Sequence, residues 1–295
     1  MPNIKILVCA HKKDYVRQDD VYMPIQVGKA ISGFDLGFQG DDTGDNISDR
    51  NDWYAELTAM YWAWKNLKGV DYIGLCHYRR YFVMRKSSLF LPSIISVSVK
   101  DYVDKKDTKV DIEFLMNNID VIVPKSGVYA TPLYIQYGLE HSLEDLSILW
   151  AIIKLKYPEY REAFDKVMLH SNTAYGCNMF VMRWKLFNEY CTWLFPLLQE
   201  SSEYIKRIPY SYQKRTLGFL AERLFEVYCE HWNLKTKQCS VYLLGDKAIQ
   251  QKYAFLKDLK IRVLNHVKFF FANLGRNNKS LDLQYVLDRS NIVIK

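Results

Sequence analysis

The chain has 295 residues, of which 49% are hydrophobic, a composition typical of globular proteins and not of disordered or fibrous ones. Its net charge of +7 favours anionic partners such as nucleotide-sugars, acidic lipid surfaces or nucleic acid, but the basic residues are interleaved with 33 acidic ones, which argues against nucleic acid. The six scattered cysteines include no CxxC pair, so we expect reduced core thiols and neither a zinc site nor a disulfide framework.

The first residues give no sign of a secretory leader, because Met1-Pro2-Asn3 leads directly into an apolar strand. No apolar run approaches the roughly 18 residues that a membrane-spanning helix needs. We therefore expect a cytoplasmic protein that is soluble or peripheral to the membrane.

The apolar, β-branched run at residues 4–10 predicts a buried first strand. Residues 17–50 read as a loop that is rich in glycine and acidic side chains. A helix is predicted from Asp52, as its N-cap, to residue 66, and a second strand follows at 71–77.

Beyond residue 83 the pattern continues to alternate strands with helices, which indicates an α/β fold with a mostly parallel sheet. Residues 83–111 read as a loop or insertion. The remaining predictions are strands at 119–124, 178–182 and 241–244, helices around 146–153, 187–198 and 217–228, and a polar loop at 200–214. We expect one domain over residues 1–250 and a separate helical extension over residues 251–295.

The extension contains a basic amphipathic helix between residues 256 and 274. Leucines, valines and phenylalanines form its apolar stripe, and Lys257, Lys260, Arg262 and Lys268 occupy the other faces. Two interpretations stay open: the stripe packs on the domain, or it contacts a membrane surface.

A polar and aromatic cluster follows the strand at 71–77, where open α/β sheets place their ligand sites. Arg79 and Arg80 suit phosphate oxygens, with His77 beside them, and Tyr78 and Tyr81 suit a sugar. Because side chains alternate along an extended chain, we expect only one of the two arginines to face the ligand. The alternative is a strand end whose arginines pair with nearby carboxylates.

His11 and Lys13 follow the first strand and are predicted to bind a nucleotide. The predicted donor site also includes Asn46 and Asn51. Asn178, after a glycine, is predicted to bind a sugar hydroxyl, or otherwise to cap a turn.

Sequence motifs for several common sites are absent, since the chain has no GxGxxG, P-loop, HExxH or GxSxG pattern. Asp41, Asp42 and Asp45 offer carboxylates for a divalent cation, but an acidic, glycine-containing run is more often a solvated loop.

Six segments resemble the bacterial capsular and exopolysaccharide glycosyltransferases long described only as a domain of unknown function. The resemblance covers roughly residues 3–230, and its most specific part is the pair YWAWKN and HYRRYF. The segments are 46–48, 56–58, 61–66, 77–82, 175–182 and 218–224.

The resemblance implies a GT-A-like, Rossmann-type fold, a nucleotide-sugar donor and a glycan acceptor on a lipid carrier, with some members transferring galactofuranose. It carries over no catalytic residue. Many GT-A enzymes bind a metal through an Asp-x-Asp after the corresponding strand, but His77-Tyr78-Arg79 stands there in this chain. We therefore expect metal-independent transfer in which fixed cations stabilise the leaving diphosphate, with magnesium or manganese as the alternative.

An inverting transfer needs a carboxylate as general base, and Glu222 is our candidate because it lies off the apolar face of its predicted helix. The expected function is transfer of galactose or galactofuranose from a UDP donor to a lipid-linked acceptor in capsular or exopolysaccharide synthesis, at the inner face of the membrane. The alternative is a non-catalytic carbohydrate- or nucleotide-binding protein of the same fold.

Overall fold

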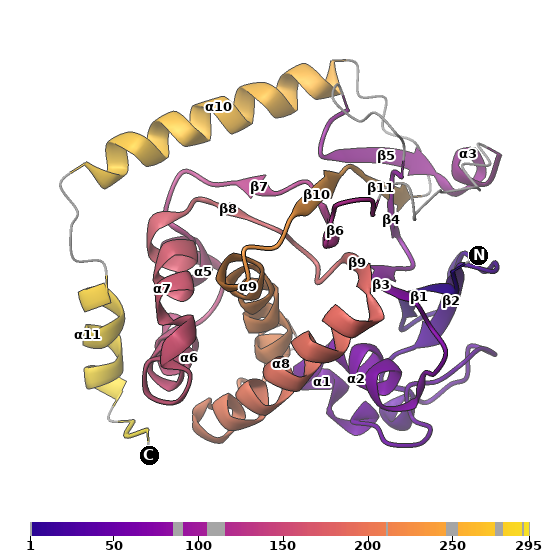
Figure 1. Ribbon diagram of the computed structural model, residues 1–295, viewed down its shortest axis with the longest axis horizontal. Helices are drawn as coiled ribbons and strands as arrows, with labels where there is room; N and C mark the ends of the chain where they lie inside the picture. Colours follow the sequence, from indigo (N-terminus) through magenta and orange to yellow (C-terminus); the bar gives the residue numbers. More distant parts are fainter. Residues whose placement is uncertain are drawn as a thin grey trace.

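The computed structural model describes residues 2–84, 91–104, 116–210, 212–245, 253–274, 280–290 and 292–294. In this part of the chain nine strands form one sheet and two short strands form another (Figure 1). The large sheet consists of β1 (Ile4–Ala10), β2 (Tyr22–Gln26), β3 (Tyr72–His77), β4 (Arg80–Phe82), β5 (Ile94–Ser98), β6 (Val121–Pro124), β9 (Phe180–Arg183), β10 (Thr236–Cys239) and β11 (Val241–Gly245). The small sheet pairs β7 (Gly127–Val128) with β8 (Thr173–Ala174).

The predicted α/β class is confirmed, but the sheet is mixed and not mostly parallel. Its order is β10-β6-β9-β3-β4-β11-β5, and β1 pairs with β3 and β2. β1 runs parallel to both partners, whereas β3 is antiparallel to β4 and β9. The physical reason is the two-residue turn Tyr78-Arg79 between β3 and β4, since only antiparallel strands can be joined so tightly.

Two hydrophobic cores lie on the two faces of the sheet. Leu7 and Cys9 of β1 belong to one core, and Ile6 and Val8 belong to the other. Successive side chains of a strand point to opposite faces, so a strand buried on both sides must be apolar throughout. This explains why β1 reads as a continuous apolar run.

The helices form most of the larger core, and α5 to α9 lie together on one side of the molecule (Figure 1). Within the described residues, none of them has both the length and the apolar character that crossing a bilayer requires. The α-helices are α1 (Asn51–Tyr54), α2 (Leu57–Asn66), α3 (Val99–Asp104), α5 (Leu133–Glu140), α6 (Leu143–Lys156), α7 (Arg161–Phe164), α8 (Trp184–Tyr204), α9 (Thr216–His231), α10 (Ala254–Asn273) and α11 (Ser280–Ser290). Shorter helical turns are η1 (Lys29–Ile31), η2 (Ser48–Arg50), η3 (Pro158–Tyr160), η4 (Asp165–Leu169) and η5 (Gln213–Arg215).

The helix predicted at residues 52–66 is divided in two. Ala55, between α1 and α2, has a φ of 49°, which an α-helix cannot accommodate. Non-glycine residues at positive φ are uncommon, and such backbone outliers cluster at functional sites. The interruption therefore marks residues 55 and 56 as a place to look for function.

Several elements lie where we expected loops. β2 falls inside residues 17–50 and contains Pro24, which lowers its strand signal. Proline is tolerated because β1 is the only named strand that pairs with β2 in the described structure. The other edge of β2 carries a bridge from Gln26 to Gly40, two residues beyond Pro24. The segment at 83–111 likewise holds β5 and α3, and α8 extends to Tyr204 into the predicted loop at 200–214.

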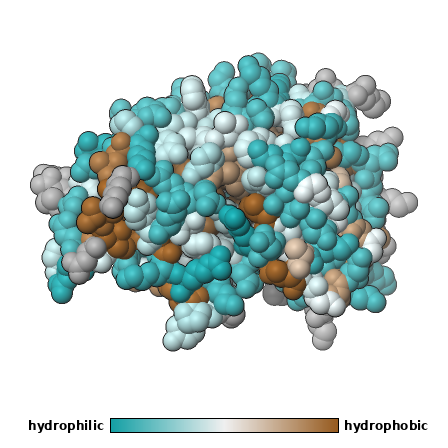
Figure 2. All heavy atoms as spheres, turned by 90° about the horizontal axis from the view of Figure 1, so that it is seen from below, coloured by the Kyte–Doolittle hydropathy of each residue, from teal (hydrophilic) through white to brown (hydrophobic). Residues whose placement is uncertain are grey.

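The C-terminal segment contains α10 and α11. α11 returns to the body of the protein, packs against α6 and buries Leu283 completely. Figure 2 shows the side of the molecule away from α10, which is largely hydrophilic, with hydrophobic side chains gathered at the left edge where α11 lies in Figure 1. The predicted domain boundary at residue 250 lies outside the described residues and stays a prediction.

Candidate active site

The carboxyl ends of β1 and β3 meet at one edge of the sheet. Cys9 pairs with His77 in register, and the chain then turns away through His11 on one strand and Tyr78 on the other. The rings of His11 and Tyr78 contact edge to face, with their centroids 5.5 Å apart. The predicted position of the ligand site is thus next to a cavity of about 890 Å³, which both strand ends line.

Several further parts of the chain complete the cavity wall. They are α1 with the α1–α2 junction, η5 with the first turns of α9, the end of β11, Cys177 before β9, Val27 after β2 and Ser96 of β5. The charged lining residues are Asp52, Glu56, Arg79, Arg80, Lys214, Arg215 and Glu222. Cations and carboxylates from distant segments therefore face one space.

The interruption at Ala55 places Glu56 in the cavity wall. Glu56 Oε1 accepts a hydrogen bond of 2.7 Å from Asn178 Nδ2, which also donates to the Gly218 carbonyl at 3.1 Å. Gly218 lies so close to the junction that a Cβ built on it would be 3.2 Å from the Ala55 Cβ. The Asn178 amide thus joins the α1–α2 junction to α9 and fixes the position of Glu56.

Glu222, on the same α9, is the second carboxylate. Its side chain is 21% exposed. Burial raises its pKa to about 7; the negative charge of Glu56 adds to the rise, while Arg223, the Cys177 N–H and Arg80 oppose it. A carboxylate that titrates near neutral pH can accept a proton and release it again.

The cations divide into two groups. Arg79 Nε and Nη2 lie 2.9 and 2.7 Å from Asp14 Oδ2, and Lys214 Nζ lies 3.5 Å from Asp52 Oδ2. Arg80 and Arg215 pair with no carboxylate among the described residues. Their positive charges are therefore available to an anionic ligand.

His11, at the end of β1, and Arg215, on η5, line the same cavity, and the charge of Arg215 acts on the His11 imidazole. Burial lowers the pKa of His11, and the positive charges of Arg215, Lys12 and His77 lower it further. A neutral imidazole can both donate and accept a hydrogen bond. His77 Nε2 is engaged at 2.7 Å with the Cys177 carbonyl, so its role is at least partly to hold the loop before β9.

Aromatic rings form another part of the wall. Tyr78, Tyr212 and Phe219 line the cavity, and the ring centroids of Tyr212 and Phe219 are 5.1 Å apart. His141 stacks on Phe219 with centroids 4.0 Å apart and supports it. Such flat, partly polar surfaces suit a sugar or a nucleotide base.

Most of the predicted site residues come together in this cavity. His11, Asn51, His77, Tyr78, Arg79, Arg80 and Glu222 all line it. Both predicted arginines do so, although we expected only one, because the turn between β3 and β4 breaks the alternation of an extended strand.

Four predicted residues are not part of the cavity lining. Lys13 is exposed beyond it, and Asn46 uses its side chain in a local turn with Gly44 and Ser48. Tyr81 is fully buried, and its hydroxyl accepts a hydrogen bond from the Arg17 N–H at 3.0 Å. Asn178 is 6% exposed, so it supports Glu56 and does not face the cavity itself.

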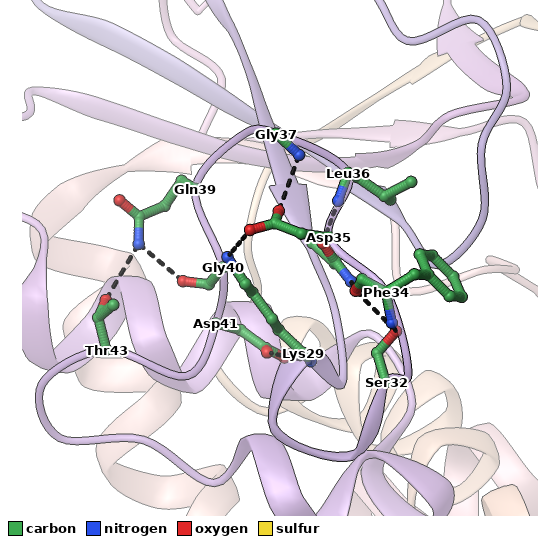
Figure 3. Close-up of polar contacts among 11 residues, drawn as sticks. Lys29, Ser32, Phe34, Asp35, Leu36, Gly37, Gln39, Gly40, Asp41 and Thr43 are labelled. Atoms are coloured by element: carbon green, nitrogen blue, oxygen red, sulfur yellow. Dashed lines mark hydrogen bonds and ion pairs between the residues drawn. The ribbon is translucent and has the colours of Figure 1, made fainter.

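The loop that leads into the acidic residues considered for metal binding is held by its own hydrogen bonds, including those of Asp35 and Gln39 (Figure 3). Asp41 is fully buried and accepts hydrogen bonds from the N–H groups of Gly28, at 2.8 Å, and Lys29, at 3.1 Å. It also accepts one from the Ser48 hydroxyl. Among the described residues, no group of three or more His, Cys, Asp or Glu side chains is arranged to hold a metal ion.

Sequence reasoning missed Glu56, Lys214 and Arg215 as site residues. Glu56 was hidden because the apolar periodicity runs through the interruption at Ala55. Lys214 fell at the end of the predicted polar loop and Arg215 directly after it, and the available signal was their position just before the helix that carries Glu222.

A family model described as a domain of unknown function (DUF4422) matches residues 5–234. Among solved structures, the chain is similar to the apo structure of WbbM, a bifunctional glycosyltransferase, with 30% sequence identity and a TM-score of 0.76. That match covers 85% of this chain and 48% of the other, so the chain spans about half the length of the WbbM structure. The search among curated proteins gave no match. The family match includes all seven charged residues of the cavity lining.

Proposed function

We propose that this chain, which belongs to the family described as a domain of unknown function (DUF4422), is a glycosyltransferase of polysaccharide synthesis. The observation that carries the proposal is that Glu222 lines the same cavity as the cations Arg80 and Arg215. A carboxylate with a raised pKa and uncompensated cations are the two groups that transfer from a nucleotide-sugar requires. The similarity to WbbM supports the class of reaction.

In the proposed reaction Glu222 acts as the general base. The acceptor hydroxyl loses its proton to Glu222 as its oxygen bonds to the anomeric carbon of the donor sugar. The bond from that carbon to the diphosphate oxygen breaks, and the leaving nucleoside diphosphate takes the electron pair. Attack occurs on the face opposite the leaving group, so the configuration of the sugar inverts.

We assign the leaving diphosphate to Arg80 and Arg215, with Arg79 beside them. Guanidinium groups fork toward phosphate oxygens, and they keep their charge throughout the reaction. Fixed cations can stabilise the charge that develops on the leaving group, which is the part that a metal ion plays in many related enzymes. Transfer without a metal ion is therefore part of the proposal.

Glu56 is assigned to a hydroxyl of the donor sugar or acceptor, since Asn178 holds it in the cavity wall. The aromatic surface of Tyr78, Tyr212 and Phe219 is assigned to the sugar and the nucleobase. From the family resemblance we further propose a UDP donor carrying galactose or galactofuranose and a lipid-linked glycan as acceptor.

The proposal is tested first by thermal shift with a panel of nucleotide-sugars that includes UDP-galactose, UDP-galactofuranose and UDP alone. A specific donor should raise the melting temperature by mass action. Release of nucleoside diphosphate in the presence of acceptor then separates an enzyme from a binding protein of the same fold. Binding without any turnover across donors and acceptors would favour the binding protein.

A further inference from the structure

α10 attaches to the body of the protein through its polar side. Asp258 Oδ2 accepts hydrogen bonds from the Ser93 N–H and hydroxyl, at 3.1 and 2.9 Å. Arg262 Nη1 donates to the Ser126 carbonyl at 2.5 Å, and Asn265 Nδ2 donates to the Val128 carbonyl at 2.7 Å. The side chains at 258, 262 and 265 recur at helical spacing, so they define one face of the helix.

The apolar stripe consequently points away from the protein. This excludes, for the described structure, the interpretation in which the stripe packs on the domain. Each large apolar residue of the outward faces is between 45% and 65% exposed. These residues, with Leu274 just after the helix, are Leu256, Leu259, Ile261, Val263, Leu264, Val267, Phe270, Phe271 and Leu274.

Exposure of this kind on one helix calls for a partner, since contiguous apolar patches on a free surface are rare. Figure 1 shows α10 along the top edge of the molecule, with no other element drawn outside it. The opposite side, in Figure 2, is largely hydrophilic. The apolar surface of α10 therefore lies on one outer side of the molecule, as docking onto a flat partner would need.

The charges of α10 select between the two simplest partners. Lys257 and Lys268 are exposed beside the stripe and Lys260 is exposed within it, whereas the acidic residue Asp258 is turned inward toward Ser93. A second copy of the chain would bring these lysines against lysines. An anionic lipid surface would neutralise them and take up the leucine and phenylalanine side chains.

We infer that α10 lies flat on an anionic membrane surface, with its apolar stripe in the lipid interface and its polar side holding the protein. The helix has 20 residues and so is about 30 Å long at 1.5 Å per residue, enough to set the orientation of the body against the surface. The inference does not depend on the proposed activity, because it rests on α10 alone.

The experiment uses the full chain and sedimentation with vesicles of phosphatidylcholine, with and without phosphatidylglycerol. The wild type should sediment with the anionic vesicles. Val263→Glu combined with Phe270→Glu should lower its partition coefficient by about tenfold or more, since charge replaces buried apolar area. Leu139→Glu is the matched control, because Leu139 is 76% exposed on α5, and it should bind like the wild type.

Melting temperature and donor-induced thermal shift report folding and the active site separately from vesicle binding. Wild-type protein that ignores anionic vesicles would overturn the inference, as would an equal loss of binding in the Leu139→Glu control. So would a dimer in light scattering that Val263→Glu with Phe270→Glu converts to a monomer, since a second copy would then be the partner.

Discussion

Glu222→Gln should abolish transfer and at the same time stabilise the protein. Glutamine keeps the shape of the side chain and can still accept the Cys177 N–H, but it cannot take a proton near neutral pH. Loss of a general base should lower turnover by about 10²–10⁴-fold. The wild-type rate itself should rise with pH through the pKa of Glu222, about 7.

The stabilisation follows from the cost of ionising Glu222 in the folded state. Its pKa is raised from 4.5 to about 7, so the folded state holds the proton more tightly than the unfolded state. This favours folding below pH 4.5, and the benefit is lost as pH rises through about 7. The difference is at most about 3–4 kcal/mol, at roughly 1.4 kcal/mol per tenfold change in proton affinity.

Urea denaturation at about pH 5 and pH 8 measures this effect, alongside a transfer assay. The free energy of unfolding of Glu222→Gln should exceed that of the wild type clearly at pH 8 and only slightly at pH 5. Glu226→Gln is the matched control, because burial raises the pKa of Glu226 to about 8 on the same helix but Glu226 does not line the cavity. It should be stabilised similarly and keep its activity. Full turnover in Glu222→Gln, or a stability difference independent of pH, would refute the reasoning.

Arg80→Ala should lower turnover by about 10²–10³-fold, whereas Arg79→Ala should mainly lower the melting temperature, because Arg79 pairs with Asp14. Kinetics and melting of both variants test this, and near wild-type turnover in both would contradict the diphosphate assignment. Glu56→Gln should move the acid limb of the pH–rate profile to lower pH, since it removes a negative charge that raises the pKa of Glu222. An acid limb at unchanged pH would mean that the two carboxylates do not interact in the working enzyme. Transfer should survive EDTA because fixed cations face the cavity, and complete loss with rescue by manganese would show that a metal ion is required after all.

The part of the site built on β1 and β3 could be predicted from sequence. Both strands are short apolar runs, and their local sequence is enough to define them. Once they are taken as neighbours, the position of His11 beside His77 follows from the parallel pairing. Glu222 could be predicted for a similar reason, because the apolar periodicity of α9 places it off the buried face of the helix.

Other parts depend on contacts between segments far apart in the chain. Ala55 has no glycine or proline beside it, and its positive φ accompanies the close approach of Gly218, which no local pattern encodes. Arg215 and His11 line the same cavity although about two hundred residues separate them in the sequence. The pattern of α10 shows that one face is apolar, but the hydrogen bond of Asp258 to Ser93 belongs to the tertiary structure and decides which face turns outward.

The contact between Ala55 and Gly218 has a consequence for engineering the donor range. Glu56 and Glu222 lie on the two segments that meet there, so the packing of two very small residues sets the spacing between the carboxylates. A Cβ added to Gly218 would be 3.2 Å from the Ala55 Cβ, which is a tight contact, and 3.5 Å from the Tyr54 carbonyl oxygen, which is an ordinary one. Gly218→Ala would therefore require α9 and the α1–α2 junction to shift relative to each other, which would change the spacing of the two carboxylates. Ala55 and Gly218 also line the cavity, so libraries aimed at other donor sugars should include this contact.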